Sequence, residues 1–231
     1  MKTLKKYAQG LRHLFYPNCC LACEEPLVQG EDYVCTKCMY MIGRTNYHLN
    51  KENPVAQLFY GRTELEFAMS YFQFEKGGLF QKLIHQLKYK GVIEIGEILG
   101  KHLGMGLKNS IHIPPLDYII PVPLHKKKEK KRGYNQSYHI ALGISKVMNV
   151  KLDTSSLERV IYKVSQTQLK REKRWENVQN NFKTTGKKLI GKHVLLVDDV
   201  LTTGATIEAC CKALKQIEGI KISVATLARA Q

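Results

Sequence analysis

Two adjacent carboxylates that follow an apolar run are the residues of this sequence with the clearest potential for chemistry. Asp198 and Asp199 come directly after residues 193–197, whose pattern is typical of a strand buried on both faces of a parallel sheet. Ligands bind at the carboxyl ends of such strands, and carboxylates there suit a ribose diol, directly or beside Mg²⁺. We therefore predict Asp198 and Asp199 as the catalytic pair of a ribose-binding site.

A turn rich in threonine follows the carboxylates and leads into a helix expected to begin near Ile207. Successive backbone N–H groups at a helix N-terminus favour a phosphate, Gly204 permits close backbone approach, and threonine hydroxyls add donors. The predicted phosphate-binding residues are Leu201, Thr202, Thr203, Gly204, Ala205 and Thr206. With the carboxylates, this element could hold a ribose 5-phosphate. The alternative is an ordinary strand, turn and helix with Thr203 or Thr206 as the helix cap.

A dense run of basic residues lies in a predicted loop after the short apolar stretch 118–122. The loop contains one acidic residue, Glu129, and the basic residues Lys126, Lys127, Lys128, Lys130, Lys131 and Arg132. It ends at a helix expected to start near Asn135. So many positive charges suit a diphosphate or a nucleic-acid backbone equally well. A solvated charged loop is the alternative.

Aromatic residues are interleaved with the basic ones, which is the mixture that single-stranded nucleic-acid binding requires. Tyr134 and Tyr138 follow the lysine run, and Trp175, the only tryptophan, follows a second basic cluster. The candidate nucleic-acid contacts are Tyr134, Lys170, Arg171, Lys173, Arg174 and Trp175. Tyr138 has helical spacing from Tyr134, so these rings could pack in the core instead. We recognise no module for base-specific readout and expect little sequence preference.

Four cysteines near the N-terminus form two C-x-x-C pairs. Cys20 and Cys23 are separated by 11 residues from Cys35 and Cys38, an arrangement that lets two knuckles converge on one tetrahedral Zn²⁺. Four thiolates close the coordination sphere, which predicts a structural zinc site. Redox-active or incidental thiols are the alternative. Cys19 adjoins the first pair, but the spacing selects Cys20.

Strands and helices alternate along the rest of the chain, as in a parallel α/β sheet. Hydrophobic spacing predicts strands at 65–74, 118–122, 193–197 and 222–227, and helices at 79–87, 92–107, 135–147 and from 207 onward. The predicted fold class is α/β, with a small N-terminal zinc-finger module. We place a basic amphipathic helix and the zinc module in residues 1–60, and the main domain in residues 61–231. The basic helix, predicted at 2–15, could lie on a membrane or a partner, or dock on its own domain.

Composition and charge limit the kinds of partner that the chain can have. With 44% hydrophobic residues, the 231-residue chain is too apolar to be disordered. Its net charge is +16, and residues 61–231 carry 29 basic against 15 acidic side chains. A field of this sign favours nucleic acid, an anionic lipid surface or a phosphorylated small molecule. The sequence has no run of 18 apolar residues and no recognisable secretory signal, which predicts a cytoplasmic protein.

The segment from Asp198 to Thr206 resembles the 5-phosphoribosyl-1-pyrophosphate (PRPP) motif of type I phosphoribosyltransferases. Further stretches extend the likeness over nearly the whole chain, which is similar to the ComF family of DNA-uptake competence proteins. These stretches are Cys20 to Cys38, 87–91 (Leu-Lys-Tyr-Lys-Gly), 121–124 (Pro-Val-Pro-Leu), 132–136 (Arg-Gly-Tyr-Asn-Gln) and 166–177. The resemblance implies a type I phosphoribosyltransferase-like sheet that binds PRPP with Mg²⁺. It also implies a pyrophosphate loop in the basic run and a mobile active-site loop at 166–177.

By the same resemblance, the protein would assist the import of single-stranded transforming DNA across the inner membrane, beside a helicase-like ATPase. Such a role would place it in the cytoplasm, with contact to the inner face of the cytoplasmic membrane left open. Two alternatives also stay open. One is a catalytic phosphoribosyltransferase acting on a nucleobase or nucleotide, and the other is a non-catalytic scaffold that senses PRPP and recruits the import ATPase.

Overall fold

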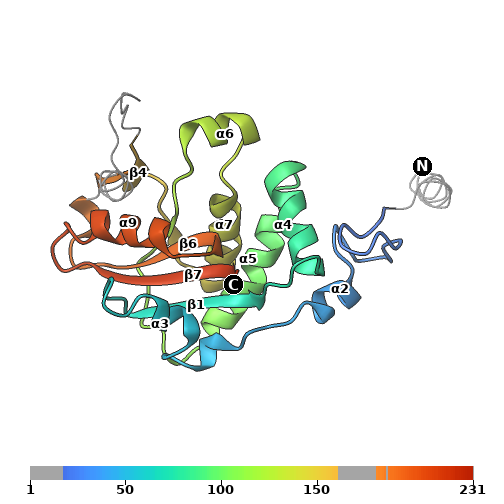
Figure 1. Ribbon diagram of the computed structural model, residues 1–231, viewed down its shortest axis with the longest axis horizontal. Coiled ribbons are helices and arrows are strands. Elements are labelled where there is room, and N and C mark those ends of the chain that lie inside the picture. The colour runs from blue at the N-terminus through green and yellow to red at the C-terminus, as the bar shows by residue number, and fades with distance from the viewer. Residues whose placement is uncertain (1–17, 161–180, 186, 231) are drawn as a thin grey trace, which may run out of the picture.

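A five-stranded parallel sheet forms the centre of the molecule (Figure 1). This computed structural model describes residues 18–160, 181–185 and 187–230. The strand order is β1-β7-β6-β2-β3, and each neighbouring pair is parallel. The strands are β1 (Phe67–Gln73), β2 (Tyr118–Pro121), β3 (Lys151–Leu152), β6 (His193–Leu201) and β7 (Lys221–Arg229). The predicted parallel α/β fold is confirmed.

Helices cover both faces of the sheet, and alternate residues of the central strand β6 face opposite sides. Leu195 and Val197 belong to one buried cluster, whereas Val194 and Leu196 belong to a second. The first cluster includes side chains of α4, α5 and α7, and the second includes side chains of α3 and α9. These helices are α3 (Pro54–Leu58), α4 (Leu79–Tyr89), α5 (Glu94–Lys108), α7 (Gln136–Met148) and α9 (Ala205–Leu214). This alternation explains why β6 is apolar at successive positions.

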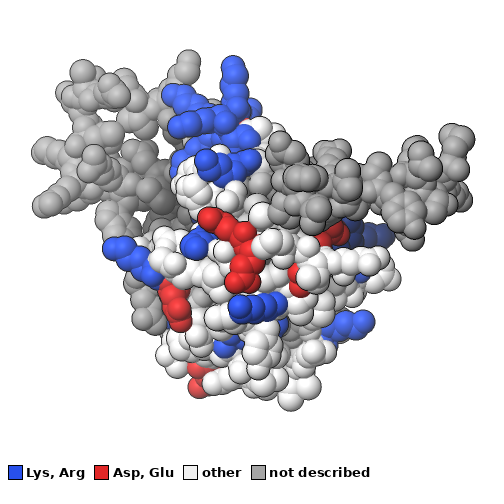
Figure 2. All heavy atoms as spheres, turned by 90° about the vertical axis from the view of Figure 1, so that its right-hand side faces the viewer, with Lys and Arg blue, Asp and Glu red and all other residues white. Residues whose placement is uncertain are grey.

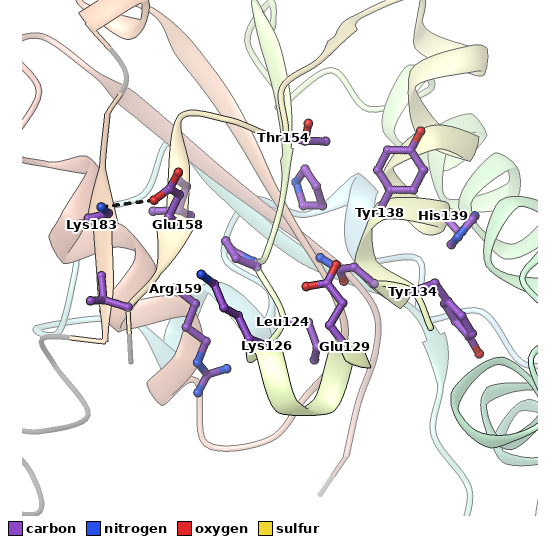
Figure 3. A pocket seen from close by; sticks show the side chains of 15 residues that line it. Leu124, Lys126, Glu129, Tyr134, Tyr138, His139, Thr154, Glu158, Arg159 and Lys183 are labelled. Atoms are coloured by element: carbon purple, nitrogen blue, oxygen red, sulfur yellow. Dashed lines mark ion pairs between the residues drawn. The ribbon is translucent and has the colours of Figure 1, made fainter. Parts of the chain in front are cut away.

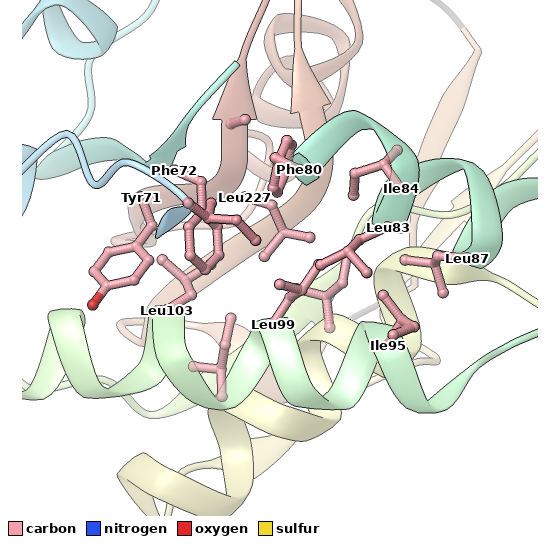
Figure 4. Close-up of a cluster of buried hydrophobic side chains, with 14 of the residues drawn as sticks. Tyr71, Phe72, Phe80, Leu83, Ile84, Leu87, Ile95, Leu99, Leu103 and Leu227 are labelled. Carbon is pink, nitrogen blue, oxygen red and sulfur yellow. The ribbon is translucent and has the colours of Figure 1, made fainter. Parts of the chain in front are cut away.

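The first buried cluster joins α4 and α5 to the sheet. Figure 4 shows Leu83 of α4 and Leu99 of α5 beside Leu227 of β7, and all three are fully buried. Behind this layer α5 and α7 approach very closely. A Cβ atom at Gly100 would lie 2.2 Å from the Ile140 carbonyl oxygen, so only glycine fits there. Tight contact with α5 fixes α7, whose first turn reaches the predicted site.

The strand β6 is longer than predicted. It continues beyond Val197 because β7 runs beside it, and Leu201 still pairs with Arg229. Asp198 and Asp199 therefore lie within the last part of the strand rather than after it. The helix α9 begins at Ala205, two residues before the expected start. Among the described residues, the other predicted strands and helices start and end within about two residues of their observed bounds.

The prediction of a loop for the basic run is wrong. Residues Lys126–Arg132 form the helix α6, which stands above the sheet edge in Figure 1. The structure also contains elements that the sequence pattern did not reveal. They are α2 (Thr36–Met41), α3, the 3₁₀ helices η1 (Tyr47–Leu49) and η2 (Lys187–Leu189), the short strand β3, and the antiparallel hairpin of β4 (Leu157–Arg159) and β5 (Phe182–Thr184).

The cysteine segment packs against the main sheet and α4. Cys20 and Ala22 belong to the same buried cluster as the α4 core, and the Lys82 ammonium of α4 donates to the Ala22 carbonyl at 3.1 Å. The domain boundary at residue 60 stays a prediction, and the basic helix at 2–15 lies outside the described residues. Within the described part of the chain, every helix is too short or too polar to cross a membrane.

Candidate ribose-phosphate and nucleic-acid site

The two predicted carboxylates are held by side chains from two different helices. Ser137, in the first turn of α7, donates its hydroxyl to Asp198 Oδ1 at 2.9 Å. Lys88, in the last turn of α4, donates its ammonium to Asp199 Oδ1 at 2.9 Å. The Asp199 backbone N–H also donates to Asp198 Oδ1 at 2.9 Å. The carboxylate pair is therefore fixed in place by contacts from α4, α7 and its own strand.

Burial changes the protonation of Asp198. Burial and the neighbouring Asp199 charge together raise the pKa of Asp198 to about 7, against the lowering effects of a backbone N–H, Ser137 and Lys88. Asp199 Oδ2 is buried and has no hydrogen-bond partner among the described residues. A buried acceptor without a partner is costly unless a ligand supplies a donor. A sugar hydroxyl can donate to this oxygen, so the carboxylate acceptors fit a ribose.

The predicted phosphate turn caps α9 without a side chain. Gly204 is the N-cap residue, with φ +80°, and makes no side-chain cap hydrogen bond. Thr203 and Thr206, the caps of the alternative interpretation, do not occupy that position. Residues 198 and 200–207 line a depression of about 40 Å³ at the turn, which suits a group the size of a phosphate. Free N–H groups of the first helical turn favour an anion there.

The helix α6 carries all six predicted cations. His125 is its N-cap and accepts from the Lys127 N–H at 3.2 Å, and Gly133 is its C-cap in the left-handed region with φ +84°. Three cations lie in its last turn, where they interact favourably with the helix dipole. None of its side chains is buried, and Figure 2 shows the Lys and Arg side chains gathered over α6. The cations are thus presented to solvent on one short helix.

A pocket of about 760 Å³ lies between the start of α6, the start of α7 and the β4 strand. Its lining includes Lys126, Tyr138 and Arg159, which Figure 3 shows around the hollow. Charged and aromatic groups in one hollow are suited to a nucleotide. Tyr134 also lines it, but its hydroxyl donates to the Leu87 carbonyl of α4. The predicted contacts Lys170, Arg171, Lys173, Arg174 and Trp175 lie outside the described residues.

The four predicted metal ligands come together. The Sγ atoms of Cys20, Cys23, Cys35 and Cys38 all lie within 4.8 Å of one another. Burial raises the pKa of the Cys20 thiol, but backbone N–H groups, those of Cys35 and Ala22 among them, lower it to about 7. Backbone N–H donors stabilise the thiolate form, which is the form that binds metal. The cluster could therefore hold one metal ion.

Three contact residues were missed by the sequence analysis. Ser137 and Lys88 hold the carboxylates, and Arg62 donates to the Thr203 carbonyl at 2.8 Å in the phosphate turn. Lys88 lies in a stretch on which the family resemblance rests, but its partner was not apparent. A regular hydrophobic pattern shows which segments form helices, but it does not show which strand end each helix lies beside.

Comparison with known proteins identifies the class of domain first. A family model for the phosphoribosyl transferase domain matches residues 135–231, which include α7, the carboxylate pair and the phosphate turn. With the parallel sheet, this match shows a type I phosphoribosyltransferase domain. A glutamine PRPP amidotransferase from B. subtilis has 20% sequence identity and a TM-score of 0.39, over 56% of this chain and 25% of that chain.

The chain belongs to the competence protein F family. It is 30% identical to Competence protein F of Haemophilus influenzae over 153 residues, which are 64% of this chain and 67% of that protein. It is also 30% identical over 150 residues to the DNA utilization protein YhgH of Escherichia coli O6:H1, over 64% of this chain. The match spans 66% of the length of that relative.

Proposed function

We propose that this protein is a competence accessory that handles incoming single-stranded DNA and binds PRPP in its phosphoribosyltransferase domain. Family membership and the domain support a role in DNA uptake. The observation that carries the proposal is the arrangement of the sheet's carboxyl edge. One strand end there carries a fixed carboxylate pair and a phosphate-sized depression, and the connection after a neighbouring strand carries α6.

The turn after β6 is the proposed PRPP site. Asp198 and Asp199 would bind the ribose hydroxyls, and residues 201–206, from the last residue of β6 to the first turn of α9, would bind the 5-phosphate through backbone N–H groups. The same two carboxylates would hold the Mg²⁺ that accompanies PRPP, since this hard cation prefers oxygen ligands. Lys88 and Ser137 orient the carboxylates for both purposes.

The helix α6 and the adjoining pocket are the proposed DNA surface. The six cations of α6, none of which is buried, would track the phosphates of the strand, while Tyr138 in the pocket offers a ring for base stacking. Single strands are favoured over duplexes, because stacking needs unpaired bases. Binding should depend little on sequence and strongly on salt.

Fluorescence anisotropy with a labelled oligothymidine tests this proposal. The full-length protein should bind the single strand more tightly than the matching duplex, and the affinity should fall as salt rises. Calorimetry with ribose 5-phosphate and with Mg²⁺·PRPP tests the second ligand site. Equal affinity for duplex and single strand would contradict the DNA proposal. Failure to bind both ribose 5-phosphate and Mg²⁺·PRPP would contradict the PRPP proposal.

The proposed partner is a helicase-like ATPase of the DNA-uptake machinery, and the proposed location is the cytoplasm, at the inner face of the membrane during uptake. The family resemblance supports both. Co-purification of the tagged full-length protein from competent cells, before and after nuclease treatment, tests the partner. An ATPase retained after nuclease treatment supports direct contact, and loss of the ATPase shows a bridge through DNA.

The proposed metal is a structural Zn²⁺ held by Cys20, Cys23, Cys35 and Cys38. Four convergent sulphur ligands suit zinc, and a site closed by protein ligands stabilises a fold rather than catalysing a reaction. Metal analysis of purified protein should find stoichiometric zinc in the wild type and in the control Cys19→Ser. The variant Cys38→Ser should lose it, together with the structure of the segment around α2. Zinc retained in Cys38→Ser would contradict this assignment.

A transfer reaction is the second candidate function, favoured by the unpartnered Asp199 Oδ2 beside the phosphate turn. In such a reaction a nucleophile forms a bond to the anomeric carbon of PRPP while pyrophosphate leaves. Pyrophosphate release would be measured with a panel of nucleobases and with single-stranded DNA, in the wild type and in Asp199→Asn. Release that depends on Asp199 would establish an enzyme, and PRPP binding without release would establish a ligand site only.

A further inference from the structure

Arg62, which precedes β1, lies against the phosphate turn, which is far from it in sequence. Its Nη1 donates to the Thr203 carbonyl oxygen at 2.8 Å. Its Nε and Nη2 both donate to Glu208 Oε2, at 3.2 Å and 2.6 Å. One guanidinium therefore joins the turn to the first turn of α9.

The guanidinium is itself held in place from the α3 side. Nη1 also donates to the Leu58 carbonyl at 3.3 Å, and the guanidinium carbon lies 5.8 Å from the centre of the Phe59 ring. Phe59 is fully buried, so it is a fixed platform. A planar guanidinium with several donors suits this combination of two carbonyls, one carboxylate and a ring, and a lysine could not reproduce it.

Glu208 creates an electrostatic problem for phosphate binding at this turn. It lies in the first turn of α9, the end at which the proposed phosphate binds, and two negative charges there repel each other. Its side chain is only 26% exposed, so water screens its charge incompletely. The positive charge of Arg62, at 2.6 Å from Glu208 Oε2, opposes this repulsion.

The turn also needs its carbonyl groups to point away from the anion. Backbone N–H groups can face a phosphate only while the neighbouring carbonyls face elsewhere, and the Thr203 carbonyl is held by Arg62, which is not among the residues that line the depression. A Cβ atom at Gly204 would lie 3.0 Å from the Phe59 ring and 3.4 Å from Arg62 Nη1. These two side chains therefore form the back wall of the turn.

We propose that Arg62 is a positioning residue for phosphate recognition, which acts by neutralising Glu208 and fixing the Thr203 carbonyl. The inference rests on the proposed function, since it concerns the phosphate of the ribose 5-phosphate group at this turn. It makes the segment before β1 part of the site, although the matched phosphoribosyl transferase domain begins at residue 135.

Calorimetric titration of full-length variants with ribose 5-phosphate tests the proposal. Arg62→Ala should weaken binding about tenfold, as expected for loss of charged hydrogen bonds. In the double variant Arg62→Ala/Glu208→Gln, the affinity should recover by at least about threefold, because the repelling charge is gone. The matched control is Lys215→Ala, which removes an exposed ion pair of the same helix with Glu64 at 3.4 Å and should leave the affinity unchanged.

The outcomes separate the possible failures. Wild-type affinity in Arg62→Ala, or no recovery in the double variant, would overturn the inference, because a purely structural Arg62 gains nothing from removal of Glu208. If the wild type itself does not bind ribose 5-phosphate, the proposed ligand site fails and this inference fails with it. Should Arg62→Ala not fold, Arg62→Lys decides, because lysine keeps a positive charge beside Glu208 but cannot also fix the Thr203 carbonyl. Binding weakened about threefold supports the inference, and unchanged binding overturns it.

Discussion

The turn from β6 into α9 and the connection from β2 to α7 both follow strand ends at the same edge of the sheet, but different forces stabilise them. The first contains a carboxylate pair with Asp199 only 5% exposed, and Lys88, Ser137 and Arg62 fix its atoms through hydrogen bonds. The second holds α6, whose side chains are all at least partly exposed. In the first region the fixed positions of a few side chains determine ligand binding, and in the second region the net charge determines it.

This difference indicates what each region can recognise. A buried acceptor and a phosphate-sized depression discriminate between small ligands, because an unmatched hydrogen bond is costly there. Solvated cations on a short helix attract any polyanion and discriminate little. A single substitution should therefore disable the first region, whereas the second should respond only to the number of charges removed.

The largest expected effect is that of Asp199→Asn. This substitution removes one buried carboxylate and leaves the Lys88 ammonium without its ion pair, so ribose 5-phosphate binding should fall on the order of a hundredfold. Calorimetry provides the measurement. Asp117→Asn is the matched control, because Asp117 also pairs with a lysine, at 3.1 Å, but at the other end of the sheet. A decrease in ribose 5-phosphate affinity of less than threefold in Asp199→Asn would contradict the view that fixed side-chain positions determine binding in this region.

Next in size is the effect of replacing the five lysines of α6 by glutamine. Single-strand affinity should fall roughly tenfold and the dependence on salt should become shallower, whereas each single replacement should have a small effect. The control replaces five exposed lysines elsewhere, Lys51, Lys76, Lys108, Lys151 and Lys221, with the same change in net charge. An equal loss in this control would show that overall charge, rather than α6, attracts DNA.

The same contrast explains which parts of the site could be predicted from sequence. Asp198, Asp199 and the four cysteines were found because their signals are local: a strand pattern, a turn composition and a repeated spacing. Their supporting residues are distant in sequence. Ser137 lies 61 residues from Asp198, Lys88 lies 111 residues from Asp199, and Arg62 lies 146 residues from Glu208.

The helix α6 was missed for a different reason. Six like charges repel one another along a helix, and no apolar face marks the helical period, so the pattern favoured a loop. The stabilising contributions come from the ends, where His125 and Gly133 cap seven residues. Most of the sheet was predicted because buried strands carry a strong apolar signal. The extension of β6 beyond Val197 was not predicted, because it depends on pairing with β7.

A third, smaller effect concerns the pH dependence of stability. The folded-state pKa of Asp198 is raised from 3.8 to about 7, so the folded protein binds a proton that the unfolded chain releases between these values. Asp198 therefore contributes less stability as pH rises from about 4 to 7. Asp198→Asn should match the wild type near pH 4 and exceed it by at least about 1 kcal/mol at pH 8.

Urea unfolding at both pH values measures this difference in the free energy of unfolding. Comparing the variant with the wild type isolates Asp198 from the histidines, whose titration is common to both proteins. A constant difference across the range would show that the pKa of Asp198 is the same in the folded and unfolded states, which would contradict this prediction.

The smallest effect is expected from removing the cap of α6. His125→Ala should destabilise the helix locally by about 0.5 kcal/mol and leave the global free energy of unfolding unchanged, because α6 buries no side chain. Hydrogen exchange of the α6 amides should accelerate about twofold.

The comparison variant is Asn135→Ala. It removes a cap hydrogen bond of 3.0 Å from α7 and a second hydrogen bond, to the Val122 carbonyl at 3.0 Å, in a helix whose residues lie in the core. There the global stability should fall by about 1 kcal/mol. Equal global losses in the two variants would mean that α6 is coupled to the core, so the two regions would not differ in the way described.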